Sequence, residues 1–124
     1  MKLRVRGDTL RLRLTRSEVD AIGRGETVEE RTGFPDGTSL TYQLAPGQVR
    51  SASQTASEAG CVVRVEIPLS EGTAWAEDDT RVGVNGEDPF LVGGLEVLIE
   101  KDFTCVTPRA GEEELDTFPN PNVA

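Results

Sequence analysis

The sequence contains no histidine and only two cysteines. Histidine is the side chain whose charge changes near neutral pH and a common ligand of zinc and copper, so its absence removes the usual general base and most such metal sites. The cysteines, Cys61 and Cys105, lie far apart and match no CxxC, zinc or haem spacing. Without a histidine partner, neither is expected to be a nucleophile. We expect both to be reduced thiols in or near the core.

Long apolar runs and basic aromatic clusters are also missing. No stretch approaches the roughly 20 apolar residues of a membrane-spanning helix, and residues 1–6 alternate in charge where a secretory signal would be apolar. These absences predict a soluble, cytoplasmic protein. Aromatic residues make up 5% of the chain and are not interleaved with lysine or arginine, and the net charge is −9. We therefore expect neither nucleic acid nor a membrane as partner.

A change in composition divides the 124 residues into two parts. Residues 1–107 carry alternating apolar and charged positions, whereas residues 108–124 contain an acidic run and end near Phe118-Pro119-Asn120-Pro121. Two prolines around an asparagine prevent both a helix and a central strand. We predict one β-rich domain over 1–107 and an acidic C-terminal tail over 108–124, which is either disordered or docked through Phe118.

Strict alternation of apolar and charged residues is the main structural pattern, and it is typical of half-buried strands. The predicted strands cover residues 2–6, 9–14, 27–32, 40–44, 49–53, 61–67, 81–84 and 95–101. Residues 54–60 are small and polar and predict a loop. Thr15 and Glu18 fit a capping box, which predicts a short helix before Gly23, and a second short helix is predicted over 70–76. Trp75 is expected to pack this second helix onto the sheet.

The predicted elements repeat along the chain. Residues 10–22 align with 63–75, and residues 40–44 align with 95–99, with apolar positions facing apolar positions. The fold class we predict is α+β, either a mostly antiparallel β-sheet or a partly open barrel, with two short helices. The repeat suggests internal duplication of a βαββ unit. Chance similarity between simple alternating patterns stays open as the alternative.

Basic residues gather near the beginning of this otherwise acidic chain. Four of them fall on the same face of the first two predicted strands: Arg4, Arg6, Arg11 and Arg13. Guanidinium groups hold phosphates and carboxylates through forked hydrogen bonds, so these arginines are the candidate site for an anionic ligand or protein partner. The alternative is structural, in which the arginines pair with carboxylates on neighbouring strands. The carboxylates with matching alternation are Glu29, Glu66, Glu96 and Glu100.

Four segments together resemble a small family of uncharacterised bacterial proteins. They are residues 1–7, residues 11–19, Glu100-Lys101-Asp102-Phe103-Thr104-Cys105 and Phe118-Pro119-Asn120-Pro121. The resemblance covers nearly the whole chain and implies a single-domain bacterial protein. Because the family has no assigned activity, the resemblance implies no catalytic residue.

The leading functional hypothesis is a small non-enzymatic binding or accessory protein whose arginines receive an anionic ligand or partner, with no cofactor and no catalytic residue. The alternative is a metal-dependent phosphohydrolase, since the predicted arrangement is similar to the triphosphate-tunnel fold. There, Glu96 and Glu100 would supply magnesium ligands. The chain departs from that family in its first strand, where Lys2 and Arg4 stand in place of alternating glutamates. Self-association, for which long edge strands are suited, is a third hypothesis.

Overall fold

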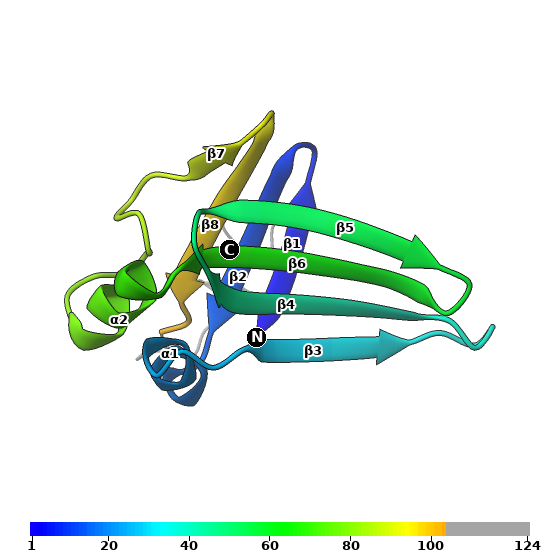
Figure 1. The fold of residues 1–124 in the computed structure, drawn as a ribbon, viewed down its shortest axis with the longest axis horizontal. Helices are drawn as coiled ribbons and strands as arrows, with labels where there is room; N and C mark the ends of the chain where they lie inside the picture. Colours follow the sequence, from blue (N-terminus) through cyan, green and yellow to red (C-terminus); the bar gives the residue numbers. More distant parts are fainter. Residues whose placement is uncertain (104–124) are drawn as a thin grey trace, which may run out of the picture.

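The computed structural model describes residues 1–103, which form two successive units with the same order of elements. The first unit contains β1 (Lys2–Arg6), β2 (Thr9–Leu14), α1 (Arg16–Gly23), β3 (Val28–Gly33) and β4 (Ser39–Gly47). The second contains β5 (Ser51–Ser57), β6 (Gly60–Pro68), α2 (Leu69–Glu77), β7 (Phe90–Val92) and β8 (Leu95–Lys101). Each unit is therefore a hairpin, a helix and a second hairpin (Figure 1).

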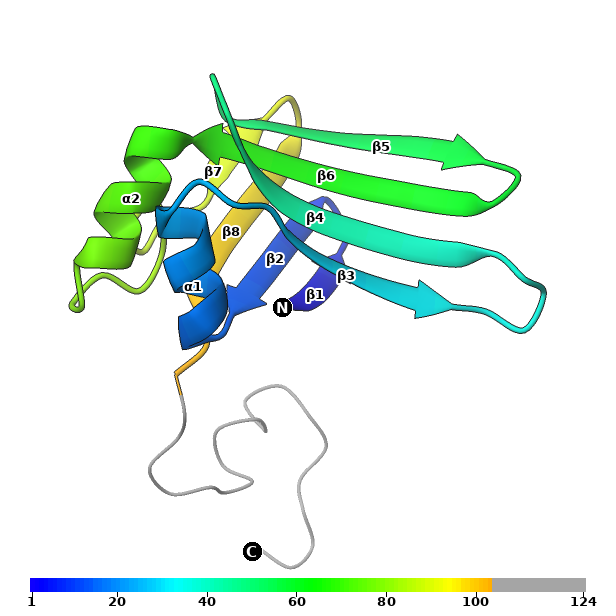
Figure 2. The ribbon, with the colours of Figure 1, turned by 60° about the horizontal axis from the view of Figure 1, so that its bottom comes forward.

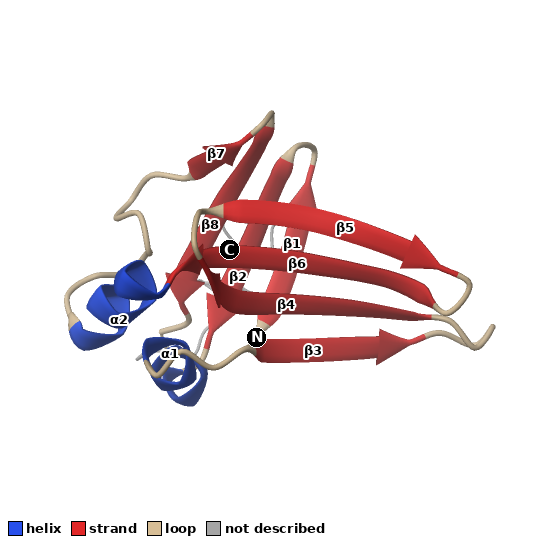
Figure 3. Ribbon diagram, viewed as in Figure 1, coloured by secondary structure: helices blue, strands red, loops and turns tan. Residues whose placement is uncertain are grey.

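The two units exchange hairpins to build two four-stranded sheets. Sheet A has the order β1-β2-β8-β7, and sheet B has the order β3-β4-β6-β5. In each sheet, one hairpin from each unit meets its neighbour through a central parallel pair, β2 with β8 or β4 with β6. Figure 3 shows the two sheets crossing, with both helices at one end. The predicted α+β class with a mostly antiparallel sheet is confirmed, and over residues 1–103 the sheets do not close into a barrel.

The strand register agrees with the internal repeat that the sequence suggests. In the repeat, Leu12 corresponds to Val65, and Ile99 corresponds to Leu44. Leu12 lies opposite Ile99 in sheet A, and Val65 likewise lies opposite Leu44 in sheet B. Leu10 and Val97 also lie opposite each other in sheet A, and their equivalents Val63 and Tyr42 lie opposite each other in sheet B. The repeating unit is one strand longer than the predicted βαββ, because each copy begins with a hairpin.

Both helices begin near the predicted positions. Thr15 caps α1 in a capping box, in which its backbone N–H donates to Glu18 Oε1 at 2.9 Å and its Oγ1 accepts from the Glu18 N–H at 3.4 Å. In α2, Trp75 is fully buried, and its indole N–H donates to the Val82 carbonyl at 3.0 Å. The predicted core position of Trp75 is confirmed.

The hydrophobic core lies where the two sheets and both helices meet. Sheets A and B contribute the alternating apolar residues of their central strands, and the helices contribute Val19, Ile22 and Trp75. Burying one large aliphatic or aromatic side chain stabilises a fold by roughly 1.5–3 kcal/mol, so this region contributes most of the stability. The far ends of the sheet B hairpins extend beyond the core (Figure 2), and β5 is exposed from Ser53 onward.

Three local predictions are wrong. The polar sequence predicts a loop over residues 54–60, but β5 continues to Ser57 because its backbone pairs with β6. The predicted strand over 81–84 is reduced to one isolated bridge, between Gly83 and Glu100. The short strand β7 is not predicted from the sequence.

Residues 104–124 lie outside the described residues, and with them Cys105, Phe118, the predicted domain boundary and the acidic tail. Within residues 1–103, neither helix has the length and apolar character needed to cross a membrane.

The helices α1 and α2 pack closely through glycine. A Cβ atom at Gly72 would lie 2.9 Å from Ile22 Cγ2, and one at Gly23 would lie 2.7 Å from Ala76 Cβ. Ile22 is buried and β-branched, so it has little freedom to move away. Because Gly72 has no side chain, the two helices can pack this closely.

Replacing Gly72 with Val is expected to lower the free energy of unfolding by about 1–3 kcal/mol, because the new side chain overpacks the contact with Ile22. Urea denaturation measures the change. The control is Ala74→Val at an exposed position of the same helix, where only helix propensity changes, by up to about 0.7 kcal/mol. Equal losses in the two variants would show that the helices do not depend on this contact.

Candidate functional site

The candidate site is the outer surface of sheet A. Alternation along β1 and β2 turns the leucines of β2 into the core and leaves the basic side chains on the opposite face. This face, which we call the cationic face, consists of Lys2, Arg4, Arg6, Arg11 and Arg13. The structure thus brings all four predicted arginines together. Lys2 is missing from the predicted set, although its place in the same alternation marks it as a member.

Like charges face each other across these two strands. The antiparallel register places Arg4 opposite Arg11 and Lys2 opposite Arg13. Like charges directly opposite in an antiparallel pair destabilise a sheet. The fold alone therefore gives no reason for this arrangement.

Carboxylates of residues 1–103 contact part of the cationic face. One carboxylate oxygen, Glu100 Oε1, lies 3.3 Å from Arg11 Nε and 3.7 Å from Arg13 Nε, so two guanidinium groups share it. At the edge, Lys2 Nζ lies 3.0 Å from Asp102 Oδ2. Within residues 1–103, the guanidinium of Arg4 has neither an ion pair nor a hydrogen bond. Within residues 1–103, the four cations Lys2, Arg4, Arg11 and Arg13 are together contacted by two carboxylates, Glu100 and Asp102.

The Nε–H group of Arg11 makes no hydrogen bond to Glu100, although the two side chains form an ion pair. Its Nε is shielded from solvent and close to Glu100, but the N–H is not aligned for a hydrogen bond to any group in residues 1–103. We read the contact as an attraction between charges, without the directed bond that a short distance suggests. A buried donor without an acceptor costs about 1–3 kcal/mol, so an added acceptor would stabilise this nitrogen.

The structural alternative, cross-strand pairing with four glutamates, holds for one of them. Glu100 contacts the arginines, whereas Glu96 lies next to Thr9, whose Oγ1 is 3.4 Å away. The other two lie on sheet B, where Glu29 accepts from Gln43 and Glu66 from Arg64. Ion pairing within the described residues therefore accounts for only part of the cationic face.

Sheet B provides an internal comparison, since the repeat gives every position of the cationic face an equivalent there. The equivalents of Lys2, Arg4 and Arg6 on β1 are Ser51, Ser53 and Thr55 on β5. The same strand arrangement thus forms with small neutral side chains. The cations of β1 are not a requirement of the architecture.

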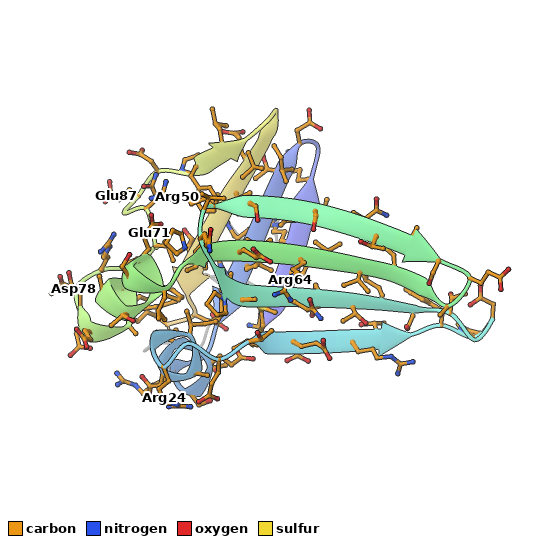
Figure 4. The ribbon with its side chains drawn as sticks, viewed as in Figure 1. Arg24, Arg50, Arg64, Glu71, Asp78 and Glu87 are labelled. Carbon is orange, nitrogen blue, oxygen red and sulfur yellow. The ribbon has the colours of Figure 1, made fainter. Side chains whose placement is uncertain are left out.

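The equivalent of Arg11 in sheet B is Arg64, which lies over the middle strands (Figure 4). Its Nε donates to Glu66 Oε2 at 2.7 Å, and its Nη1 donates to Gln43 Oε1 at 2.9 Å. Gln43 in turn donates to Glu29 Oε1 at 2.6 Å. This arginine has a connected set of acceptors, whereas Arg11 and Arg13 of sheet A share one carboxylate.

The cationic face contains a shallow hollow of about 370 Å³. Its lining consists of Lys2, Leu3, Arg4, Arg11 and Arg13. Small-molecule sites commonly have volumes of roughly 300–1,000 Å³, so the hollow is large enough for a phosphate or carboxylate group and its neighbours. Arg6 lies outside the hollow, at the end of β1.

A second kind of polar contact repeats in both units and is structural. The Met1 ammonium nitrogen lies 2.6 Å from Glu18 Oε2 and 3.1 Å from Glu30 Oε1. In the second unit, Arg50 Nε lies 2.8 Å from Glu71 Oε1 (Figure 4). The guanidinium carbon of Arg50 also lies 4.9 Å from the centre of the Phe90 ring. In each unit, a cation just before the first strand contacts a glutamate in the first turn of the helix. Because both copies have this contact, we assign it to the fold.

The predicted metal ligands do not form a metal site in the described part of the chain. Glu96 and Glu100 share one face of β8, but Glu100 contacts two arginines. Among residues 1–103, no three histidine, cysteine, aspartate or glutamate side chains converge on one point. Together with the open sheets, this geometry gives the triphosphate-tunnel alternative no support.

Cys61 is a half-buried free thiol on β6, and Gln54 Nε2 lies 3.0 Å from its Sγ. It lies near the turn of the β5–β6 hairpin, opposite the exposed Ala56, and is not among the side chains that pack against the core, so the predicted position near the core is wrong for Cys61.

The fold and this surface describe an α+β protein with one cationic sheet face. The chain belongs to DUF7009, a family of unknown function, whose model matches residues 1–122. The expectation of an uncharacterised family is thereby confirmed. No curated protein and no solved structure matches the chain.

Glu18 has several hydrogen-bond donors around its carboxylate. Burial alone would raise the pKa of Glu18, but hydrogen bonds from the Met1 ammonium and from Thr15 outweigh burial and hold the pKa below its usual value. Since the folded-state pKa is lowered, the stabilising effect of this carboxylate is complete above pH 4.5, the ordinary value. The effect is lost as the pH falls through the folded-state pKa.

Replacing Glu18 with Gln is expected to lower the free energy of unfolding at pH 7 by about 1.5–3 kcal/mol, the range for hydrogen bonds to a charged group. The difference from the unmodified protein should shrink as the pH falls below 4.5. Urea denaturation at a series of pH values measures both effects. The control, Glu87→Gln in an exposed loop (Figure 4), should change little. A Glu18 effect that is independent of pH would contradict this account.

Proposed function

We propose that this protein is a small binding or accessory protein whose cationic face binds an anionic ligand or partner. The observation that carries the proposal is the difference between two equivalent surfaces of one molecule. Sheet B builds its outer face with serine, threonine and an arginine that donates to Glu66 and Gln43. In sheet A, the contacts within residues 1–103 give Lys2, Arg4, Arg11 and Arg13 only two carboxylates, Glu100 and Asp102. A surface with an excess of charge that its own fold does not need is suited to a partner of opposite charge.

The geometry favours a partner with more than one negative group. Side chains directly opposite across an antiparallel pair have Cβ atoms about 4.5–5.5 Å apart, so Arg4 and Arg11 can hold the same carboxylate or phosphate between them. Guanidinium donors bind such groups in a forked geometry. The hollow beside them offers room for a second group near Lys2 and Arg13. Acidic peptides and polyphosphates share this chemistry.

We propose binding rather than catalysis, because the charged side chains of the cationic face are placed to attract an anion. The neighbours on β8 are Glu96, Leu98 and Glu100, and the closest hydroxyl on β2 is Thr9. Glu100 is engaged with Arg11 and Arg13. The arrangement therefore supports recognition of an anion.

Titration of ¹⁵N-labelled protein with tripolyphosphate, and separately with a hexaglutamate peptide, tests the proposal. We expect the backbone and arginine Nε–H signals of the cationic face to shift with at least one of the two. Arg4→Ser combined with Arg6→Thr should raise the Kd at least tenfold. Each lost charge-assisted hydrogen bond contributes about 1.5–3 kcal/mol, and about 1.4 kcal/mol corresponds to tenfold. These replacements copy Ser53 and Thr55 of sheet B, so the fold should be retained.

The matched control is Arg31→Ser, which removes an exposed cation from β3 in sheet B. Its Kd should stay within about twofold, because Arg31 is not on the cationic face. A response to tripolyphosphate alone would indicate a phosphorylated ligand, and a response to the peptide alone would indicate an acidic protein segment. No shift with either up to about 1 mM, equivalent to a free energy of about −4 kcal/mol, would contradict the proposal. Equal weakening in the control would contradict it as well.

A further inference from the structure

The two sheets end in four edge strands: β1 and β7 in sheet A, and β3 and β5 in sheet B. An edge strand presents backbone N–H and C=O groups that are free to pair with another strand. Proteins prevent such pairing with charged side chains, with proline, with bulges or by keeping the edge short. The four edges can therefore be compared by the protection that each one has.

Three of the four edges are protected. Strand β1 carries Lys2, Arg4 and Arg6, so two copies of it would repel each other. Strand β3 carries three consecutive charged residues, at positions 29–31, and is soon followed by Pro35. Strand β7 has only three residues and directly follows a proline. Each of these features is a known device against edge-to-edge pairing.

The fourth edge, β5, has none of this protection. Its seven residues, Ser-Ala-Ser-Gln-Thr-Ala-Ser, include no charge and no proline. Its register with β6 runs without a bulge from Ser51 to Ser57. Residues 53–57 are exposed, and within residues 1–103 no strand pairs with the outer edge (Figure 2). A straight, neutral and exposed edge of this length is suited to strand addition.

We propose that β5 pairs in an antiparallel manner with β5 of a second copy of this chain, which joins two B sheets into one continuous sheet. Full overlap of the seven residues centres the pair on Gln54 and places Ser53 opposite Thr55 of the second copy. The same register places Ser51 opposite Ser57 and Ala52 opposite Ala56 of the second copy. Side chains of similar size thus meet along the whole pair, as a self-complementary two-fold contact requires.

The sequence of β5 favours a second copy as the occupant, and its lack of charge permits the approach. The chain has a net charge of −9, so most pairs of surfaces on two copies repel each other. The β5 edge is neutral, and its sequence is nearly the same read in either direction, so it is complementary to the same edge on another copy. The contact lies on sheet B and uses no residue of the cationic face, so this inference is independent of the proposed anion binding.

Sedimentation analysis of the full chain over a range of concentrations tests the proposal. We expect a concentration-dependent species with twice the 13.4 kDa mass of the chain. Ser53→Arg combined with Thr55→Arg should raise the dimer dissociation constant at least tenfold, because arginines of the two copies then face each other. The equivalent strand β1 already carries Arg4 and Arg6 at these positions, so the sheet accommodates the change. The control exchanges the two residues, Ser53→Thr with Thr55→Ser, and should dimerise like the unmodified protein.

Cross-linking tests the register. In a background of Cys61→Ser and Cys105→Ser, Gln54→Cys should form a disulfide-linked dimer under mild oxidation, because residue 54 lies opposite itself at the two-fold axis. Ser57→Cys in the same background should not, since the two positions are then about 20 Å apart at roughly 3.4 Å per residue. A protein that stays monomeric at every concentration would overturn the proposal. A dimer that survives the two arginines, or a dimer in which Ser57→Cys cross-links and Gln54→Cys does not, would also overturn it.

Discussion

The parallel pairing of β2 with β8 and of β4 with β6 is the interaction on which the rest of this structure depends. Each parallel pair joins one unit of the chain to the other, so neither sheet is complete with the strands of a single unit. The helices carry the chain from one sheet to the other and meet where Gly72 allows close contact with Ile22. The core fills the space between these elements.

Because the two units are equivalent, features that the fold requires can be distinguished from features that are present in only one unit. The contact between a cation before the first strand and a glutamate in the helix occurs in both units, through Met1 and Glu18 and through Arg50 and Glu71. A contact that recurs in both copies is explained by the fold. The row of basic side chains on β1 has no counterpart on β5, so the fold does not explain it.

Much of the fold could be predicted from the sequence, because strands with one buried face show apolar and polar residues in alternation. The strands containing Leu12, Val65 and Val97 were recognisable in this way, and the Thr15 capping box marked the start of α1. Strand β5 was predicted only as far as Ser53, since both of its faces are exposed beyond that residue and nothing enforces alternation there. The parallel pairs were not predicted either, because half-buried strands show the same alternation whichever direction their neighbour runs.

The candidate site was partly predictable for the same reason. Alternation places Arg4, Arg6, Arg11 and Arg13 on one face, but it does not show that Glu100 is shared by two of them. That sharing depends on the pairing of β2 with β8, which joins residues far apart in the chain. The comparison with sheet B needs the structure as well, since the hairpins β1-β2 and β5-β6 have different lengths and do not align at one constant offset in sequence.

The central claim is that the cations of β1 serve a purpose other than folding. The most direct measurement is the free energy of unfolding of a variant whose β1 carries the outer-face residues of β5: Lys2→Ser, Arg4→Ser and Arg6→Thr. We expect a free energy of unfolding within about 0.5 kcal/mol of that of the unmodified protein, or higher, because the like charges opposite Arg11 and Arg13 are removed. A loss of more than about 1 kcal/mol would show that these side chains hold the sheet together, and would contradict the account.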